Sequence, residues 1–128
     1  MRKLDGLLVT LKDPEHFGIL KVKDVQVEDS LEGIYKAMNV DCIEVPVIGN
    51  GWQMILDEEG KINGKWKPTM TAEMFGLRDI LFGPILFLGL TEDGENASLA
   101  KEQKEEIMGL LNASKNTSWT FIYSKSKK

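Results

Sequence analysis

Residues 79–90, DILFGPILFLGL, form the longest nearly uncharged apolar run in the chain and decide its fold. The apolar residues do not alternate with polar ones, which is typical of a segment buried on both faces. Gly83-Pro84 interrupts the run, and a regular helix through this pair is costly because proline has no N–H donor. We therefore predict a short lead-in, a kink at Gly83-Pro84 and a central strand over residues 85–90.

The N-terminal part of the chain predicts a hairpin of two strands. Residues 7–12 and residues 18–25 are both strand-like, and the second segment alternates apolar residues with lysines. Such alternation indicates one buried and one solvated face. Asp13-Pro14 supplies turn chemistry between the two segments, so they can pair as neighbours.

A helix is predicted to follow this hairpin. Asp29 and Ser30 are candidate N-caps, and Asp29 has the spacing of a capping box with Glu32. The helical stripe at i, i+3, i+4 and i+7 consists of Leu31, Ile34, Tyr35 and Met38. Asn39 tolerates the left-handed conformation of a C-cap, so we expect the helix to end there.

A second hairpin is predicted between this helix and the central strand. Residues 42–48 and 52–57 are strand-like, and Gly49-Asn50-Gly51 between them is a strong turn sequence. Pro46 lies inside the first of these strands, where it indicates a sheet edge or a β-bulge. Residues 58–61 close the second strand with another turn.

The stretch from residue 61 to residue 78 loses its periodicity and reads as a long loop, a feature that is often functional. Trp66 lies between two lysines in this loop, and an exposed tryptophan in that setting would be a binding feature. The alternative is a tryptophan that packs back onto the sheet as a loop anchor. Arg78-Asp79 borders the loop and reads either as part of a site or as a structural ion pair. The candidate binding residues are Lys65, Trp66, Lys67, Arg78 and Trp52.

The C-terminal part predicts one more helix and one more strand. Residues 92–96 form an acidic turn, and Ser98 is the candidate cap of a helix that ends at Asn112. The helical stripe of this segment comprises Gln103, Ile107, Leu110 and Leu111. Residues 119–123 can add an edge strand, and residues 125–128 form a basic tail.

These elements predict an α+β fold with a mainly antiparallel sheet of five or six strands and two packed helices. The length of 128 residues favours a single domain. We place this domain at residues 1–124 and the tail at residues 125–128.

Composition excludes several kinds of chemistry. The formal net charge of −4 does not favour direct binding to nucleic acid. With one cysteine, Cys42, and one histidine, His16, the usual zinc ligands cannot be assembled, and His16 lies in a turn-like sequence. No signal peptide or membrane span is predicted, and a lone cysteine fits a reducing cytoplasm. The carboxylates of residues 57–59 are interpreted as a solvated turn. We therefore expect no catalytic residues, no metal and no cofactor.

The order of several segments resembles a known family. These segments are residues 31–35, 43–45, 55–61, 78–89, 98–99 and 102–103. Together they are similar to a small domain of unknown function found in phages, plasmids and integrative elements of bacteria. The resemblance covers about residues 30–107, without the N-terminal hairpin or the tail after Asn112. Family members tend to carry a Leu-Pro-Pro-Asn-Arg-like loop segment, of which only Lys67-Pro68 remains here. The resemblance implies an accessory gene of a mobile element in a bacterial cell, and it assigns no catalytic residues.

Two functions from different classes remain open. The first is a non-enzymatic phage-type protein that binds and inhibits a host protein, such as a defence effector, whose basic surface complements the acidic chain. The second is an oligomeric binder that sequesters a nucleotide signal, with Trp66 stacking on the base and Lys65, Lys67 and Arg78 meeting phosphates.

Overall fold

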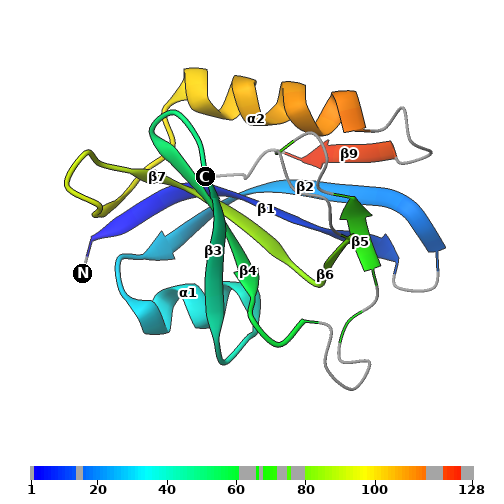
Figure 1. Ribbon diagram of the computed structural model, residues 1–128, viewed down its shortest axis with the longest axis horizontal. Helices are drawn as coiled ribbons and strands as arrows, with labels where there is room; N and C mark the ends of the chain where they lie inside the picture. Colours follow the sequence, from blue (N-terminus) through cyan, green and yellow to red (C-terminus); the bar gives the residue numbers. More distant parts are fainter. Residues whose placement is uncertain are drawn as a thin grey trace.

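The computed structural model describes residues 2–13, 16–60, 66, 68–71, 75, 80–114 and 120–124 (Figure 1). Only the backbone is described for some of these residues, namely 12–13, 16–19, 68, 70–71, 113–114 and 120–124. The elements are the strands β1 (Lys3–Asp13), β2 (His16–Glu28), β3 (Ile43–Ile48), β4 (Trp52–Asp57), β5 (Pro68–Thr71), β6 (Ile80–Phe82), β7 (Ile85–Leu90), β8 (Asn96–Ala97) and β9 (Thr120–Ser124), and the helices α1 (Leu31–Met38) and α2 (Lys101–Ser114).

The main sheet has the strand order β3-β4-β7-β1-β2-β9, and the short β8 pairs with β7. Neighbouring strands are antiparallel except β2 and β9, which run parallel. The structure therefore confirms the predicted α+β fold. β5 and β6 form a separate two-stranded sheet.

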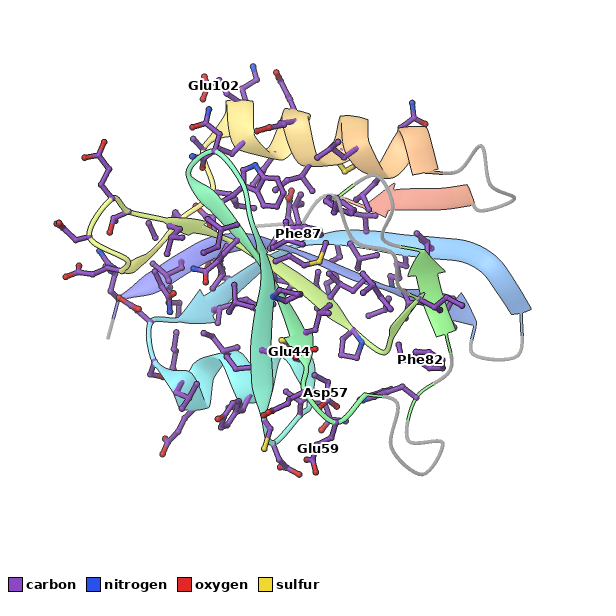
Figure 2. The ribbon with its side chains drawn as sticks, viewed as in Figure 1. Glu44, Asp57, Glu59, Phe82, Phe87 and Glu102 are labelled. Atoms are coloured by element: carbon purple, nitrogen blue, oxygen red, sulfur yellow. The ribbon has the colours of Figure 1, made fainter. Side chains whose placement is uncertain are left out.

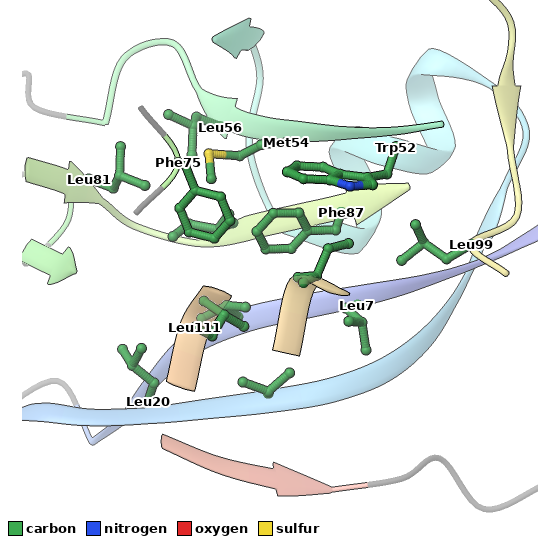
Figure 3. Packing of buried hydrophobic residues seen from close by; sticks show 14 residues of the cluster. Leu7, Leu20, Trp52, Met54, Leu56, Phe75, Leu81, Phe87, Leu99 and Leu111 are labelled. Atoms are coloured by element: carbon green, nitrogen blue, oxygen red, sulfur yellow. The ribbon is translucent and has the colours of Figure 1, made fainter. Parts of the chain in front are cut away.

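Side chains of the sheet are buried on both faces, and each face packs against one helix. One cluster combines Ile85 and Phe87 of β7 with Ile107 of α2, and Figure 3 shows its packing. The other combines Leu86 of β7 with Ile34 of α1. In Figure 1 the two helices accordingly lie on opposite sides of the sheet.

The central strand follows the prediction closely. β6 is the lead-in, Gly83 has a φ of +81°, and β7 covers residues 85–90. A positive φ is readily adopted only by glycine, so Gly83 makes the kink. β7 lies between β4 and β1, and its residues 85–89 are all buried.

The N-terminus of α1 corrects the predicted capping box. Ser30 is the N-cap, and its hydroxyl accepts a hydrogen bond of 2.9 Å from the Gly33 N–H. Asp29 instead forms an ion pair of 2.6 Å with Arg2, because the N-terminus lies close by. Asn39 is confirmed as a left-handed C-cap with a φ of +59°.

The N-terminus of α2 also differs from the prediction. The helix begins at Lys101 because Ser98 is used elsewhere: its hydroxyl accepts a hydrogen bond of 2.9 Å from the Asp5 N–H. Gln103 takes over the capping, since its side-chain oxygen accepts a hydrogen bond of 2.8 Å from the Ala100 N–H. The helix ends at Ser114 rather than Asn112.

Further differences concern segment lengths and the long loop. The N-terminal hairpin is confirmed, and β1 and β2 extend beyond their predicted ends. His16 begins β2 and does not lie in a turn. The predicted loop contains β5, which pairs with β6, and Thr69 there donates a hydrogen bond of 2.6 Å to the Gly83 carbonyl. Strands this short leave little periodicity in a sequence. The basic tail lies outside the described residues.

Candidate functional site

Trp52 is a core residue and not part of a binding surface. Its exposed fraction is 3%, and its ring meets Phe75 and Phe87 edge-on at centroid distances of 6.2 and 5.8 Å. The indole N–H donates a hydrogen bond of 3.0 Å to a carboxylate oxygen of Glu106 on α2. The structure thus corrects the selection of Trp52 as a contact residue (Figure 3).

Trp66 is half-buried and packs against the α1 side of the core. Its indole N–H donates a hydrogen bond of 2.6 Å to Oδ2 of Asp57. Its ring lies against Gly83, where an added Cβ would approach Trp66 Cγ to 2.7 Å. These contacts are those of a loop anchor, the alternative that the sequence left open. Lys65, Lys67 and Arg78 lie outside the described residues, so the basic part of the predicted site is not placed.

Asp57 differs from the solvated carboxylate that the sequence suggested. Its exposed fraction is 4%, and its Oδ1 accepts a hydrogen bond of 2.9 Å from the Glu59 N–H. Together with the Trp66 indole, this donor offsets the cost of burying a carboxylate. Asp57 therefore ties the turn after β4 to the Trp66 anchor, and no alternation within β4 marks it, because all six residues of that strand are buried.

Strand β3 forms an open edge of the main sheet, because β4 is its only strand partner in the part of the chain described. Val45 is 41% exposed and Ile48 is 66% exposed, and the intervening Pro46 is also exposed. The pairing with β4 shifts register between Glu44 and Val47. The prediction of an edge or bulge at Pro46 is confirmed on both counts.

Carboxylates surround one end of this strand. Asp41, Glu44 and Glu58 are exposed and Glu59 is half-buried. Figure 2 shows Glu44 near Asp57 and Glu59, in agreement with the pairing of Glu44 with Leu56. Among the described residues, ion pairs join Arg2 to Asp29 and Lys104 to Asp24, and none involves the exposed carboxylates named here. We call the surface formed by Asp41, Glu44, Val45, Ile48, Glu58 and Glu59 the β3 face.

The thiol of Cys42 adjoins these carboxylates. Desolvation raises the pKa of Cys42, and the charges of Glu59 and Glu58, a hydrogen bond with Glu59 and the charge of Asp41 raise it further. A thiol with a raised pKa is a poor nucleophile at neutral pH. Cys42 therefore offers no basis for covalent catalysis.

The described residues hold neither a metal-binding cluster nor a helix able to span a membrane. They contain no group of three or more His, Cys, Asp or Glu side chains arranged to hold a metal ion. Neither α1 nor α2 has the length and apolar character that a membrane crossing requires.

Residues 9–112 match the family described as Domain of unknown function (DUF3846). The chain belongs to this family. The DUF3846 match begins at Val9 and thus includes most of the N-terminal hairpin, which the resemblance over about residues 30–107 left out. No significant match was found among curated proteins or solved structures.

The β3 face and the Trp66 anchor both lie within the DUF3846 region of the chain. Arg2 and its ion pair with Asp29 extend beyond it at the N-terminus. The DUF3846 description assigns no activity to either feature.

Proposed function

We propose that this protein is a non-enzymatic accessory protein of a bacterial mobile element, such as a phage, and that it binds and inhibits a host protein in the cytoplasm. A defence effector is the kind of host protein that such an element gains most from inhibiting. The proposal joins the family resemblance to one structural observation, the β3 face.

The β3 face combines exposed apolar side chains with carboxylates that form no ion pair with the described lysines and arginines, at an open sheet edge. Val45 and Ile48 are large apolar residues that folding leaves in water. Isolated exposed residues of this kind are common, but here two lie on one strand, with Val45 next to Glu44 and Ile48 toward the other end of the strand. Apolar contacts within a polar rim are the usual anatomy of a protein–protein interface. This combination is the observation that carries the proposal.

The contacts of the described acidic and thiol groups support binding rather than catalysis. A general acid or base needs a tuned pKa and access to substrate. Asp57 instead accepts hydrogen bonds from Trp66 and the Glu59 N–H, and it is buried. Cys42 has a raised pKa.

The nucleotide-binding alternative gains no support from Trp66, the residue predicted to stack on the base. The Trp66 ring packs against the α1 side of the core and lies against Gly83, and its indole N–H donates to Asp57. Stacking on a base requires an accessible ring face. The contacts of Trp66 therefore favour the protein-binding function over nucleotide binding.

Affinity capture from a bacterial host lysate tests the proposal. The tagged chain is compared with the double variant Glu44→Lys/Glu58→Lys and with the matched control Glu102→Lys/Glu105→Lys on α2. Both variants move the formal net charge from −4 to 0, so they differ only in the surface altered. We expect one host protein to be captured by the native chain and the α2 variant and lost with the β3 variant.

The captured protein is then assayed for its own activity with and without the native chain. Inhibition by the native chain and the α2 variant, and none by the β3 variant, is the expected result. Capture that both variants abolish equally would reflect net charge alone and would overturn the β3 face as the binding surface. Absence of any specific capture would overturn the proposed function.

A further inference from the structure

We infer that the β3 face binds a lysine- and arginine-rich, nucleic-acid-binding surface of its partner, and that it does so through side chains rather than by adding a strand to the sheet. This inference rests on the proposed function and names the class of partner surface. It has three steps, which concern charge, backbone and competition.

The first step is the charge of the β3 face. Asp41, Glu44 and Glu58 are exposed, and the described lysines and arginines form no ion pair with them. Like charges gathered at one end of a strand repel one another, and a cationic surface relieves that repulsion. Charge complementarity speeds association and suppresses wrong partners. The favoured occupant is therefore basic.

The second step is the backbone of β3. The register passes from Glu44 opposite Leu56 to Val47 opposite Met54, so β3 contains one residue more than β4 over this interval. Such a bulge disrupts the ladder, and Pro46 within it has no N–H to donate. Proline and bulges are the devices by which natural sheets block edge-to-edge pairing.

The outward hydrogen-bonding groups of β3 are therefore separated. Cys42 O accepts from the Glu58 N–H, and the Gly49 N–H donates to Trp52 O, so these two residues face β4. By the alternation of an antiparallel ladder, the backbone groups of Ile43 and Ile48 point away from β4. With the bulge between them, they offer no continuous template for a strand. Val45 and Ile48 are left to bind by their side chains.

The third step concerns the nucleic acid that the basic partner surface binds when the β3 face does not occupy it. Dense lysine and arginine on a protein surface is the usual electrostatic mark of nucleic-acid binding. A chain that neutralises this surface with carboxylates competes with phosphates for the same side chains. We therefore expect binding of the β3 face and binding of nucleic acid to exclude each other.

The test uses a defined probe and a readout for each residue. The ¹⁵N-labelled chain is titrated with a helical amphipathic peptide of leucine and arginine, and with the same peptide carrying glutamate in place of arginine. We expect the arginine peptide alone to shift the amide signals of residues 41–48 and 58–59. Its affinity should fall at least about tenfold in Glu44→Lys/Glu58→Lys, stay unchanged in Glu102→Lys/Glu105→Lys, and decrease with added salt.

Several outcomes would overturn the inference. Equal shifts along α2, or no shift, would show that the β3 face does not select a basic surface. New slow exchange of the Ile43 and Ile48 amide protons with bound peptide would indicate strand addition instead. A chain that ends at Ser124 tests the protein's own basic tail as occupant. If removing residues 125–128 alone moves the β3 signals, the tail is the occupant and the inference is wrong.

Competition on the captured host protein completes the test. Duplex DNA is expected to release that protein from the immobilised chain, whereas polyglutamate of matched charge should release much less. Equal release by both polymers would show a merely basic surface and overturn the nucleic-acid part of the inference. If the peptide fails to bind while capture still depends on Glu44 and Glu58, this inference fails and the proposed function stands. Loss of capture itself counts against the proposed function.

Discussion

At the residue scale, Gly83 joins the central strand to the Trp66 anchor. Its φ of +81° makes the kink before β7, and the Trp66 ring occupies the space where a side chain would start. The Thr69 hydroxyl also donates to the Gly83 carbonyl. One glycine therefore makes the turn of the backbone and contacts both Trp66 and Thr69.

Gly83→Ala and Gly94→Ala separate these two roles. Both glycines have a similar positive φ, +81° and +83°, but an added Cβ at Gly94 meets nothing within 4 Å. We expect Gly94→Ala to lower the free energy of unfolding by about 1–2 kcal/mol from backbone strain alone. Gly83→Ala should cost clearly more, because Trp66 must also move. Urea melts measure the difference, and equal losses would show that the Trp66 contact contributes nothing.

Trp66→Phe tests the hydrogen bond that ties the anchor to Asp57. Phenylalanine keeps an aromatic ring near Gly83 but has no N–H, so the buried carboxylate loses a donor. Leaving a buried acceptor without its donor costs about 1–3 kcal/mol. Trp66→Ala removes the ring as well and should cost more. The urea midpoint is the measurement, and a Trp66→Phe variant as stable as the native chain would contradict this account.

The raised pKa of Cys42 predicts slow alkylation. Because desolvation, and after it the charges of Glu59 and Glu58, disfavour the thiolate, the reactive form is scarcer at pH 8 than in a free thiol of ordinary pKa. Iodoacetamide should therefore react more slowly with the folded chain than with the unfolded chain, and the rate should increase as the pH rises. Glu59→Gln should speed the folded-state reaction. A rate unchanged by Glu59→Gln would contradict the electrostatic cause.

At the scale of elements, the sequence predicted segments well where hydrophobic pattern and turn chemistry agree. β4 has its predicted bounds, and Asn39 ends α1 as expected. The errors lie where a tertiary contact competes with a local rule. Asp29 has capping-box spacing but pairs with Arg2, and Ser98 precedes a helix but bonds to the Asp5 N–H. Arg2 and Asp5 are both far in sequence from the residues they contact, so a local pattern cannot predict either contact.

The candidate site was only partly predictable, because it too depends on contacts between residues that are not neighbours in the sequence. Trp66 was singled out because it lies between two lysines in a stretch without periodicity. Its role, however, depends on contacts with Asp57 and Gly83, which are not its neighbours in the sequence. The β3 face was not selected at all. Pro46 indicated an edge, yet the position of Glu58 and Glu59 at the start of β3 depends on how β3 pairs with β4.

Ser30→Ala and Ser98→Ala test the corrected assignment of the helix caps. Ser30 caps α1 in the structure, so its replacement should cost about 0.5–2 kcal/mol. Ser98 caps no helix, so Ser98→Ala should leave the helical signal of α2 intact and should affect stability only through the bond to Asp5. Thermal melts and amide exchange of α2 check both. Loss of protection in the first turn of α2 in Ser98→Ala would restore the original prediction.

At the scale of the whole molecule, β7 couples the two halves of the core. Phe87 belongs to the cluster under α2 and Leu86 to the cluster under α1, and both are fully buried. A strand that supplies both clusters cannot lose its packing on one face and stay in place for the other. We therefore expect the two faces of the sheet to unfold together.

Leu86→Ala and Phe87→Ala test this coupling. A cavity in either cluster should cost about 2–5 kcal/mol, a large share of the 5–15 kcal/mol that stabilises a domain. Leu31→Ala is the control, because Leu31 is 54% exposed and its loss should matter little. Fluorotryptophan labels the three tryptophans of the chain, and the ¹⁹F resonances of Trp52 and Trp66 report on opposite faces of the sheet. In each core variant both resonances should change at the same, lowered urea concentration. If Leu86→Ala released Trp66 while Trp52 kept its native midpoint, the two clusters would be separate folding units and β7 would not couple them.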